Sequence, residues 1–222
     1  MKVPLPQAKG ERVLADWVTA SLQQAILHGH FDPGEKLDQD LIAAEFGVSR
    51  TPIREALKVL ESEGFVEIRP HRGAFIPIIS REDVHDIYEV RSLLEAEAVR
   101  VATPLIPDSV LDEMERSLDQ GREHLSAGDS AHHFVNDTYF HDTIFEYVQN
   151  RMMKEVLEGL DNRVLRVRRF ALTQPGSHLE ESINEHCAIL EAMRRRDPQA
   201  AAQAMIEHLL KSASRIQELI KA

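Results

Sequence analysis

The stretch Gly47-Val-Ser-Arg-Thr-Pro-Ile-Arg-Glu-Ala-Leu57 contains a helix end, a tight turn and a helix start within eleven residues. Gly47 can adopt the left-handed conformation that closes a preceding helix, and Ser49 can accept amide hydrogen bonds at the start of the next one. Pro52 suits the first helical turn, where backbone N–H groups have no partner within the helix. The pattern therefore predicts a helix-turn-helix.

The second helix of this pair has two different faces. Its apolar residues recur at three- and four-residue spacing, as on a buried stripe: Ile53, Ala56, Leu57 and Leu60. Off that stripe lie Arg50, Thr51, Arg54 and Lys58. The net charge of the chain is −11, but residues 1–80 carry nine Lys/Arg against eleven Asp/Glu, or −2, and residues 81–222 carry seventeen against twenty-six, or −9. A local positive face therefore survives on this helix and favours salt-dependent phosphate binding.

The residues around this pair predict a small domain. Helices are expected over 11–28, 38–46 and 49–63, and β-prone runs follow at 65–68 and 74–76. Three helices and a hairpin form a winged helix-turn-helix. The hairpin tip is basic, and Arg69, His71 and Arg72 favour entry into a minor groove, although a solvated basic turn is the alternative.

The second half of the chain shows only helical patterns. After a proline-interrupted segment near residues 77–80, six helices are expected: one that Ser80 caps, then 107–125, 130–149, 151–173, 177–196 and 198–221. We therefore expect a mainly α protein, with a winged helix-turn-helix over 1–77 and an all-α antiparallel bundle over 78–222. Cys187 is the single cysteine, and no run is long enough to span a bilayer, so a reducing cytoplasm and no membrane partner are expected.

Four ionisable residues lie on apolar faces of the bundle helices: Asp137, His141, His186 and His208. Burying a carboxylate without a partner costs several kcal/mol, so a divalent ion bound by all four is one interpretation. The alternative is hydrogen-bonded core histidines and an ion pair from Asp137 to Arg91 or Arg163. Arg91 also lies on an apolar face, where it can form a salt bridge or bind the carboxylate of a ligand. Arg163, nearer the edge of its stripe, is a weaker candidate for the same role.

Three motifs of the first half occur together: Pro33-Gly-Glu-Lys-Leu37, Phe46 to Leu57, and Leu60-Glu-Ser-Glu-Gly-Phe-Val66 followed by Arg72-Gly73. They resemble the GntR family of bacterial transcription regulators. The second half is similar to the FadR-like branch of that family, whose all-helical effector domain is of the FCD type. The motifs that carry this second resemblance are Tyr88-Glu-Val-Arg-Ser-Leu-Leu-Glu95, Asp137-Thr-Tyr-Phe-His141, Glu185-His186 and His208-Leu209.

The resemblance implies a homodimer on a pseudo-palindromic operator in double-stranded DNA. It also implies a metal site at Asp137, His141, His186 and His208. The DNA contacts that it implies are Ser49, Arg50, Thr51 and Arg54 from the reading helix, and His71, Arg72 and Gly73 from the wing.

These features lead to one functional hypothesis. We expect a ligand-responsive transcription regulator, such as a repressor, whose bundle binds zinc, nickel, iron or manganese and senses a small organic acid through Arg91 and Arg163. One alternative is the same regulator with a structural or empty metal site. Another is a helical metallohydrolase, but no positioned nucleophile or general base stands out, so an enzyme is not expected.

Overall fold

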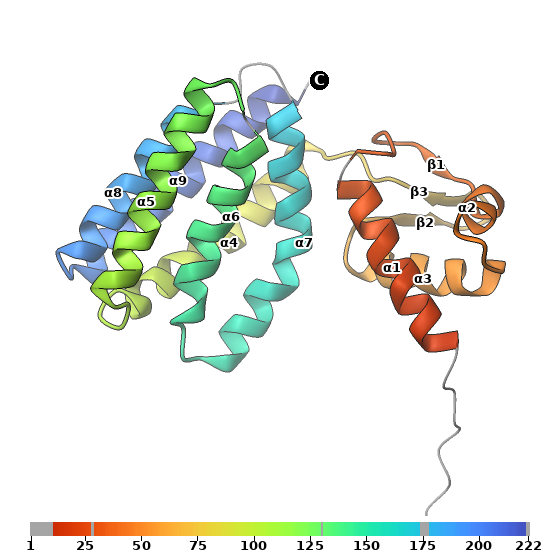
Figure 1. Ribbon diagram of the computed structural model, residues 1–222, viewed down its shortest axis with the longest axis horizontal. Coiled ribbons are helices and arrows are strands. Elements are labelled where there is room, and N and C mark those ends of the chain that lie inside the picture. The colour runs from red at the N-terminus through yellow and green to blue at the C-terminus, as the bar shows by residue number, and fades with distance from the viewer. Residues whose placement is uncertain (1–10, 28, 130, 174–177, 221–222) are drawn as a thin grey trace, which may run out of the picture. The chain divides into compact units, whose positions relative to one another are not determined.

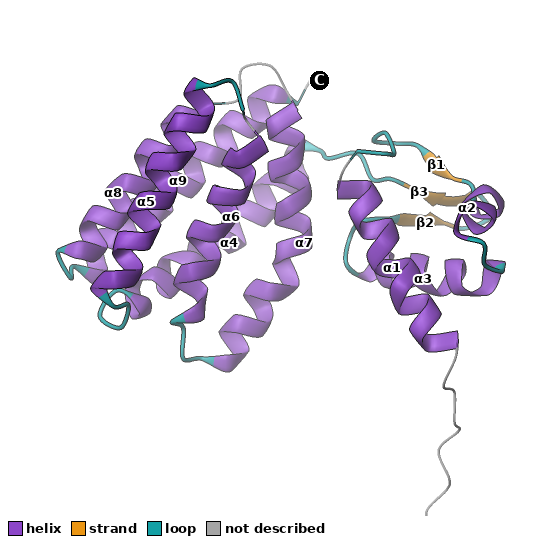
Figure 2. Cartoon of the chain, in the orientation of Figure 1, coloured by secondary structure: helices purple, strands orange, loops and turns teal. Residues whose placement is uncertain are grey.

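The computed structural model describes residues 11–27, 29–129, 131–173 and 178–220. The chain divides into two compact units, Met1–Ile78 and Ile79–Ala222 (Figure 1). In the described part of the chain, the first unit contains helices and three short strands, and the second contains helices alone (Figure 2). This arrangement confirms the predicted fold class.

The first unit is built from three helices and a small sheet. Its elements in chain order are α1 (Glu11–Leu27), β1 (Lys36–Leu37), α2 (Gln39–Phe46), α3 (Arg50–Ser62), β2 (Glu67–Arg69) and β3 (Gly73–Phe75). The strands are antiparallel in the order β1-β3-β2. Ala74 of the central strand β3 pairs with Leu37 of β1 on one side and with Ile68 of β2 on the other. The hairpin was expected, whereas β1 lies outside the β-prone runs predicted at 65–68 and 74–76.

The turn between α2 and α3 forms as predicted in one respect and differs in another. Gly47 closes α2 in the left-handed region, with φ of 64°. Asp38 caps the start of α2, because its Oδ1 accepts the N–H groups of Asp40 (2.9 Å) and Leu41 (3.2 Å). Ser49 precedes α3, but its side chain makes no capping hydrogen bond. The prediction that Ser49 caps this helix was therefore wrong.

The buried stripe of α3 packs into the core of the first unit. The buried residues of α3 are Pro52, Ile53, Ala56, Leu57 and Leu60. The same core includes Val18 and Leu22 of α1 and Phe65 before β2. Because this stripe is fully used in packing, the polar residues of α3 remain at the surface.

The second unit is a bundle of six helices in the described residues. They are α4 (Arg81–Ala102), α5 (Asp108–Ser126), α6 (Ala131–Glu146), α7 (Arg151–Thr173), α8 (Leu179–Arg194) and α9 (Pro198–Leu219). A full capping box starts α4, since the Ser80 N–H donates to Asp83 Oδ2 (2.8 Å) and the Asp83 N–H donates to Ser80 Oγ (3.0 Å). The helix ends predicted at His28, Ser130, Ser177 and Lys221 lie outside the described residues.

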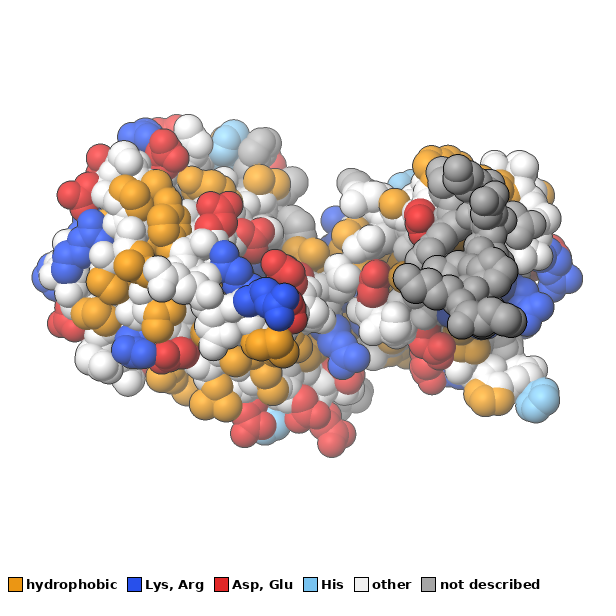
Figure 3. All heavy atoms as spheres, turned by 90° about the horizontal axis from the view of Figure 1, so that it is seen from below, with side chains coloured by type: hydrophobic (Ala, Val, Ile, Leu, Met, Phe, Trp, Pro, Cys, Tyr) orange, Lys and Arg blue, Asp and Glu red, His pale blue; other side chains and the backbone are white. Residues whose placement is uncertain are grey.

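The core of the bundle combines apolar and charged side chains. The helix α4 packs most extensively against α9, and α8 packs against both α9 and α5. Buried Phe140, Ile144 and Met205 lie in this core, and so do three histidines, Arg91 and Glu95. Large hydrophobic side chains also reach the surface of the unit, as on the face drawn in Figure 3. None of the described helices is long and apolar enough to cross a membrane.

Candidate metal centre and DNA-reading surface

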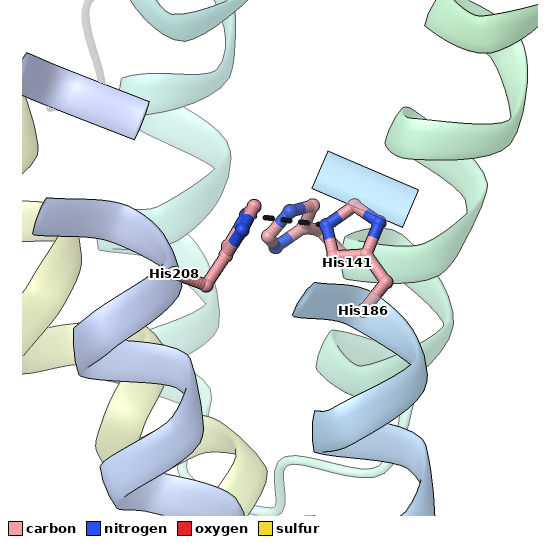
Figure 4. A group of neighbouring side chains, drawn as sticks. All are labelled: His141, His186 and His208. Atoms are coloured by element: carbon pink, nitrogen blue, oxygen red, sulfur yellow. Dashed lines mark hydrogen bonds between the residues drawn. The ribbon is translucent and has the colours of Figure 1, made fainter. Parts of the chain in front are cut away.

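Three histidines from three helices meet inside the bundle. His141 comes from α6, His186 from α8 and His208 from α9, and their exposed fractions are 1, 1 and 3%. One ring nitrogen of each lies within 4.8 Å of the others, and the three rings converge in Figure 4. The described structure thus brings together three of the four residues predicted as metal ligands.

Buried charged residues orient His141. Its Nδ1 lies 2.6 Å from Glu95 Oε2, and the other oxygen of Glu95 accepts a 2.6 Å hydrogen bond from Nε of Arg91. Burial by itself would raise the pKa of Glu95, but the charge of Arg91 and the hydrogen bond from His141 lower it well below its ordinary value. An ionised carboxylate only accepts hydrogen bonds, so Nδ1 of His141 donates and Nε2 is left with its lone pair.

Burial also keeps His141 neutral. It lowers the pKa of this imidazole to about 4, although the charge of Glu95 acts in the opposite direction. Nε2 is buried and has no hydrogen-bond partner in the described part of the chain. A neutral imidazole with a buried, unused lone pair is a ready metal ligand.

A second carboxylate orients His208 in the same manner. Nδ1 of His208 lies 2.9 Å from Glu185 Oε2, and both oxygens of Glu185 accept hydrogen bonds from Arg215 at 2.7 Å. Burial would raise the pKa of Glu185, but the hydrogen bonds from Arg215 and His208 lower it to about 2. Carboxylates that fix the tautomer and the orientation of ligating histidines are common around protein metal sites.

The remaining histidine is positioned by stacking. The ring of His186 stacks on Phe140 with centroids 4.2 Å apart, and its Nε2 lies 3.1 Å from Nε2 of His208. Two imidazole nitrogens that each bind one ion at about 2.1 Å are separated by about 3.0–3.4 Å in octahedral or tetrahedral geometry. The observed separation therefore fits a shared ion, and the residues present fit a metal.

Asp137 stands at the edge of this cluster. Its Oδ1 lies 3.7 Å from Nε2 of His186, and its Oδ2 forms a 3.0 Å ion pair with Nε of Arg168. Among the described residues, the group whose ligand atoms all lie within 4.8 Å contains the three histidines without Asp137. The ion pair is with Arg168, where the sequence had offered Arg91 or Arg163.

A cavity of about 80 Å³ adjoins the histidines. Three arginines line it, Arg91, Arg168 and Arg215, as do the apolar side chains Leu179 and Ile216. The charge of Glu95 raises the pKa of Arg91 despite burial, which acts in the opposite direction, so its guanidinium stays charged. Nη2 of Arg91 is buried and makes no hydrogen bond to any residue that the structure describes.

Arg163 is placed differently from the prediction. It is exposed on α7 and is not among the residues that line this cavity. Arg168, five positions further along the helix, occupies the place expected of it. The pattern of apolar helix faces did not single out four residues of this centre: Glu95, Arg168, Glu185 and Arg215. The signal for Glu95 is its spacing, because Arg91 and Glu95 stand four residues apart on one buried helix face.

The residues predicted to contact DNA lie at the surface of the first unit. Ser49, Arg50, Thr51 and Arg54 are exposed at the start of α3. Arg50 forms a 3.1 Å ion pair from its Nε to Oδ1 of Asp40 on α2.

The wing has a tightly formed tip. His71 and Arg72 are exposed, and Gly73 is half-buried with φ of 107°. His71 itself has a positive φ of 59°, which turns the chain sharply at the tip. Arg69 is not free to reach outward, because it pairs with both oxygens of Glu67 (2.8 and 3.0 Å) and lies over the ring of Phe75.

Comparisons with known proteins agree with this architecture. Residues 14–76 match the model of the bacterial regulatory proteins of the gntR family, and residues 86–211 match the FCD domain. The HTH-type transcriptional regulator YdhC of Bacillus subtilis (strain 168) is 30% identical over 189 residues, which is 84% of each chain. The HTH-type transcriptional repressor RspR of Escherichia coli (strain K12) is 28% identical over 198 residues, covering 89% of this chain and 86% of that protein.

Solved structures share the fold. A GntR regulator from Rhodococcus sp. RHA1 superposes with a TM-score of 0.78 at 23% identity, over 93% of this chain and 99% of that one. E. coli McbR/YncC superposes with a TM-score of 0.75 at 22% identity, over 92% of this chain and 97% of that one. The relatives are regulators and not enzymes, which confirms the expectation against a metallohydrolase. The chain is a DNA-binding transcription regulator that belongs to the GntR family, in the FadR-like branch with an FCD domain.

Proposed function

We propose that this regulator binds a divalent metal ion in its helical unit and uses it to sense a small carboxylate. His141, His186 and His208 would bind the ion, with Asp137 as a further ligand on the side of Arg168. A bound ion would supply Lewis-acid affinity for an anionic oxygen. The observation that carries the proposal is the pair of buried, unpartnered atoms in the described structure, Nε2 of His141 and Nη2 of Arg91.

The chain's own residues perform the recognition in this proposal. Arg91 donates from Nη2 to one carboxylate oxygen of the ligand, while Glu95 holds the guanidinium in place through Nε. Arg168 and Arg215 add positive charge to the same cavity, and Leu179 and Ile216 exclude water from the carbon skeleton. A cavity of this size and charge favours a short acid with more than one carboxylate.

Ligand binding is then linked to DNA binding. The histidines lie on α6, α8 and α9, and Arg91 lies on α4, so a ligand that contacts both biases the packing of four helices. We propose a homodimer that reads a pseudo-palindromic operator through Ser49, Arg50, Thr51 and Arg54, with His71, Arg72 and Gly73 at the minor groove. Coupling of about 1–3 kcal/mol changes operator affinity by one to two orders of magnitude. We propose a cytoplasmic location and repression as the output; the name of the E. coli relative states repression for that protein.

Fluorescence anisotropy tests the coupling directly. The operator duplex is first recovered by selection from random DNA with the full-length protein. Its affinity is then measured with the metal-loaded and the chelated protein, against a panel of mono-, di- and tricarboxylates. We expect at least one acid to change the affinity about tenfold or more in the metal-loaded protein and to have no effect after chelation. An unchanged affinity under every condition would reject the metal-coupled sensor.

A structural metal is the second candidate, because buried ligands from three helices can also hold a bundle together. Elemental analysis and thermal unfolding separate the two cases. His208→Ala would lower the unfolding temperature in both, but only in the sensor would Arg91→Gln abolish the acid response while leaving the metal content at its original value. Arg100→Gln is the matched control, since Arg100 is a surface arginine of the same helix.

A further inference from the structure

Asp40 and Arg50 form an ion pair across the helix-turn-helix. Asp40 stands in the first turn of α2 and Arg50 at the first position of α3, and Nε of Arg50 lies 3.1 Å from Oδ1 of Asp40. The side chain of Arg50 is 64% exposed and that of Asp40 is 66% exposed. Exposed ion pairs contribute about 0–1 kcal/mol to folding, so stability offers little reason for this pair.

Capping does not explain Asp40 either. The cap of α2 is Asp38, which accepts the backbone N–H of Asp40 itself. The carboxylate of Asp40 therefore remains available, and it is directed at the guanidinium of Arg50. Placed beside the DNA-reading face of α3, a carboxylate is also costly for DNA binding, because phosphates repel it.

The geometry of the pair gives the carboxylate a role. The 3.1 Å contact involves Nε, and the two Nη groups of Arg50 form the planar fork that pairs with O6 and N7 of guanine. Holding Nε fixes the direction of a long side chain before DNA arrives, which lowers the entropy lost on binding. A negative charge at this place also weakens phosphate contacts, and these are independent of sequence.

We infer that Asp40 is a specificity-determining residue of the DNA-reading surface: it orients Arg50 toward a base and reduces binding to non-operator DNA. The inference rests on the proposed role of Arg50 in the major groove. It extends that role to a residue on the preceding helix, which itself makes no favourable contact with phosphate.

The test measures discrimination between two duplexes with the full-length protein. One is the operator recovered by selection, and the other has the same composition in scrambled order. For Asp40→Asn we expect tighter binding to the scrambled duplex and a specificity ratio about tenfold lower, as for loss of one base contact. Glu45→Gln is the matched control, because it removes an exposed carboxylate from the same helix. We expect it to leave the ratio within about twofold of the original, as for an exposed charge that makes no base contact.

Further variants separate orientation from folding. Asp40→Glu retains the charge and should restore most of the ratio, and thermal unfolding of all variants should be unchanged. In Arg50→Ala the ratio falls, and adding Asp40→Asn to it should lower the ratio no further.

Two results would overturn the inference. If Arg50→Ala loses discrimination while Asp40→Asn keeps it, the inference fails and the proposed groove contact stands. If Arg50→Ala keeps discrimination, both fail.

Discussion

Glu95 links the proposed ligand site to the histidine cluster, since one oxygen orients His141 and the other holds Arg91. Its removal should therefore disturb both at once. For Glu95→Gln we expect metal affinity to fall about 10–100-fold, as for loss of other carboxylates that orient a ligating histidine. Equilibrium dialysis with zinc measures this effect.

A control on the same helix makes the Glu95 result specific. Glu97→Gln removes a surface carboxylate that pairs with Arg100, and it should leave zinc affinity unchanged. If Glu95→Gln binds zinc as tightly as the unsubstituted protein, His141 is either not a ligand or does not need this orientation.

Asp161 on α7 gives the bundle a pH-dependent stability. Burial, and next the charge of Asp142, raise the pKa of Asp161 to about 6. A carboxyl whose pKa is raised on folding binds its proton more tightly in the folded state than in the unfolded chain. Its full contribution to the free energy of unfolding is therefore present below about pH 4 and is lost as the pH rises through about 6. Asp161→Asn should therefore match the original protein at about pH 4 and exceed it by about 1 kcal/mol at about pH 7, after discounting for partial exposure.

Thermal unfolding at several pH values tests the role of Asp161. The surface variant Asp86→Asn, on α4, serves as the comparison, because it removes an exposed carboxylate from the same unit. Equal stabilisation by Asp161→Asn at both ends of the pH range would contradict the assignment.

At the scale of single elements, the two helix starts of the helix-turn-helix differ. Asp38 caps α2 with two hydrogen bonds, whereas the Ser49 side chain makes none to α3. We expect Asp38→Ala to cost about 1 kcal/mol of stability and Ser49→Ala less than about 0.5 kcal/mol. Urea unfolding checks both values.

DNA binding should show the reverse order, since Ser49 is proposed to contact the operator. Ser49→Ala then weakens operator binding without a loss of stability, and Asp38→Ala mainly lowers stability. If Ser49→Ala lowers stability as much as Asp38→Ala does, Ser49 acts as a helix cap, and the expectation is wrong.

For the molecule as a whole, the homodimer remains a prediction. Val90 and Leu93 are exposed on α4, at 41 and 71%, and such large apolar side chains are candidates for burial by a second copy. Leu93→Glu should shift the protein toward monomer in sedimentation velocity and weaken operator binding. Its circular dichroism should not change, because Leu93 is not part of the core of one protomer. A variant that still sediments as a dimer would exclude this face.

The sequence predicted the elements well because their signals are local. The signals at Gly47, at the helix start at residue 198 and in the apolar stripe of α3 each act within a few residues, and the structure has these features where expected. The sequence also indicated the histidine cluster, because all three histidines lie on apolar helix faces that are expected to be buried. It did not predict that Asp137 would pair with Arg168, or that β1 would join the sheet, because both depend on contacts between segments far apart in the chain.

The three histidines come from segments separated by long stretches of chain, with α7 lying between α6 and α8. An ion shared by them would act as a reversible cross-link that closes two loops of the polypeptide. Cross-links of this kind restrict the unfolded chain more than the folded one. The availability of metal in the cell would then set the lifetime of the regulator against proteolysis, apart from any effect on its affinity for DNA.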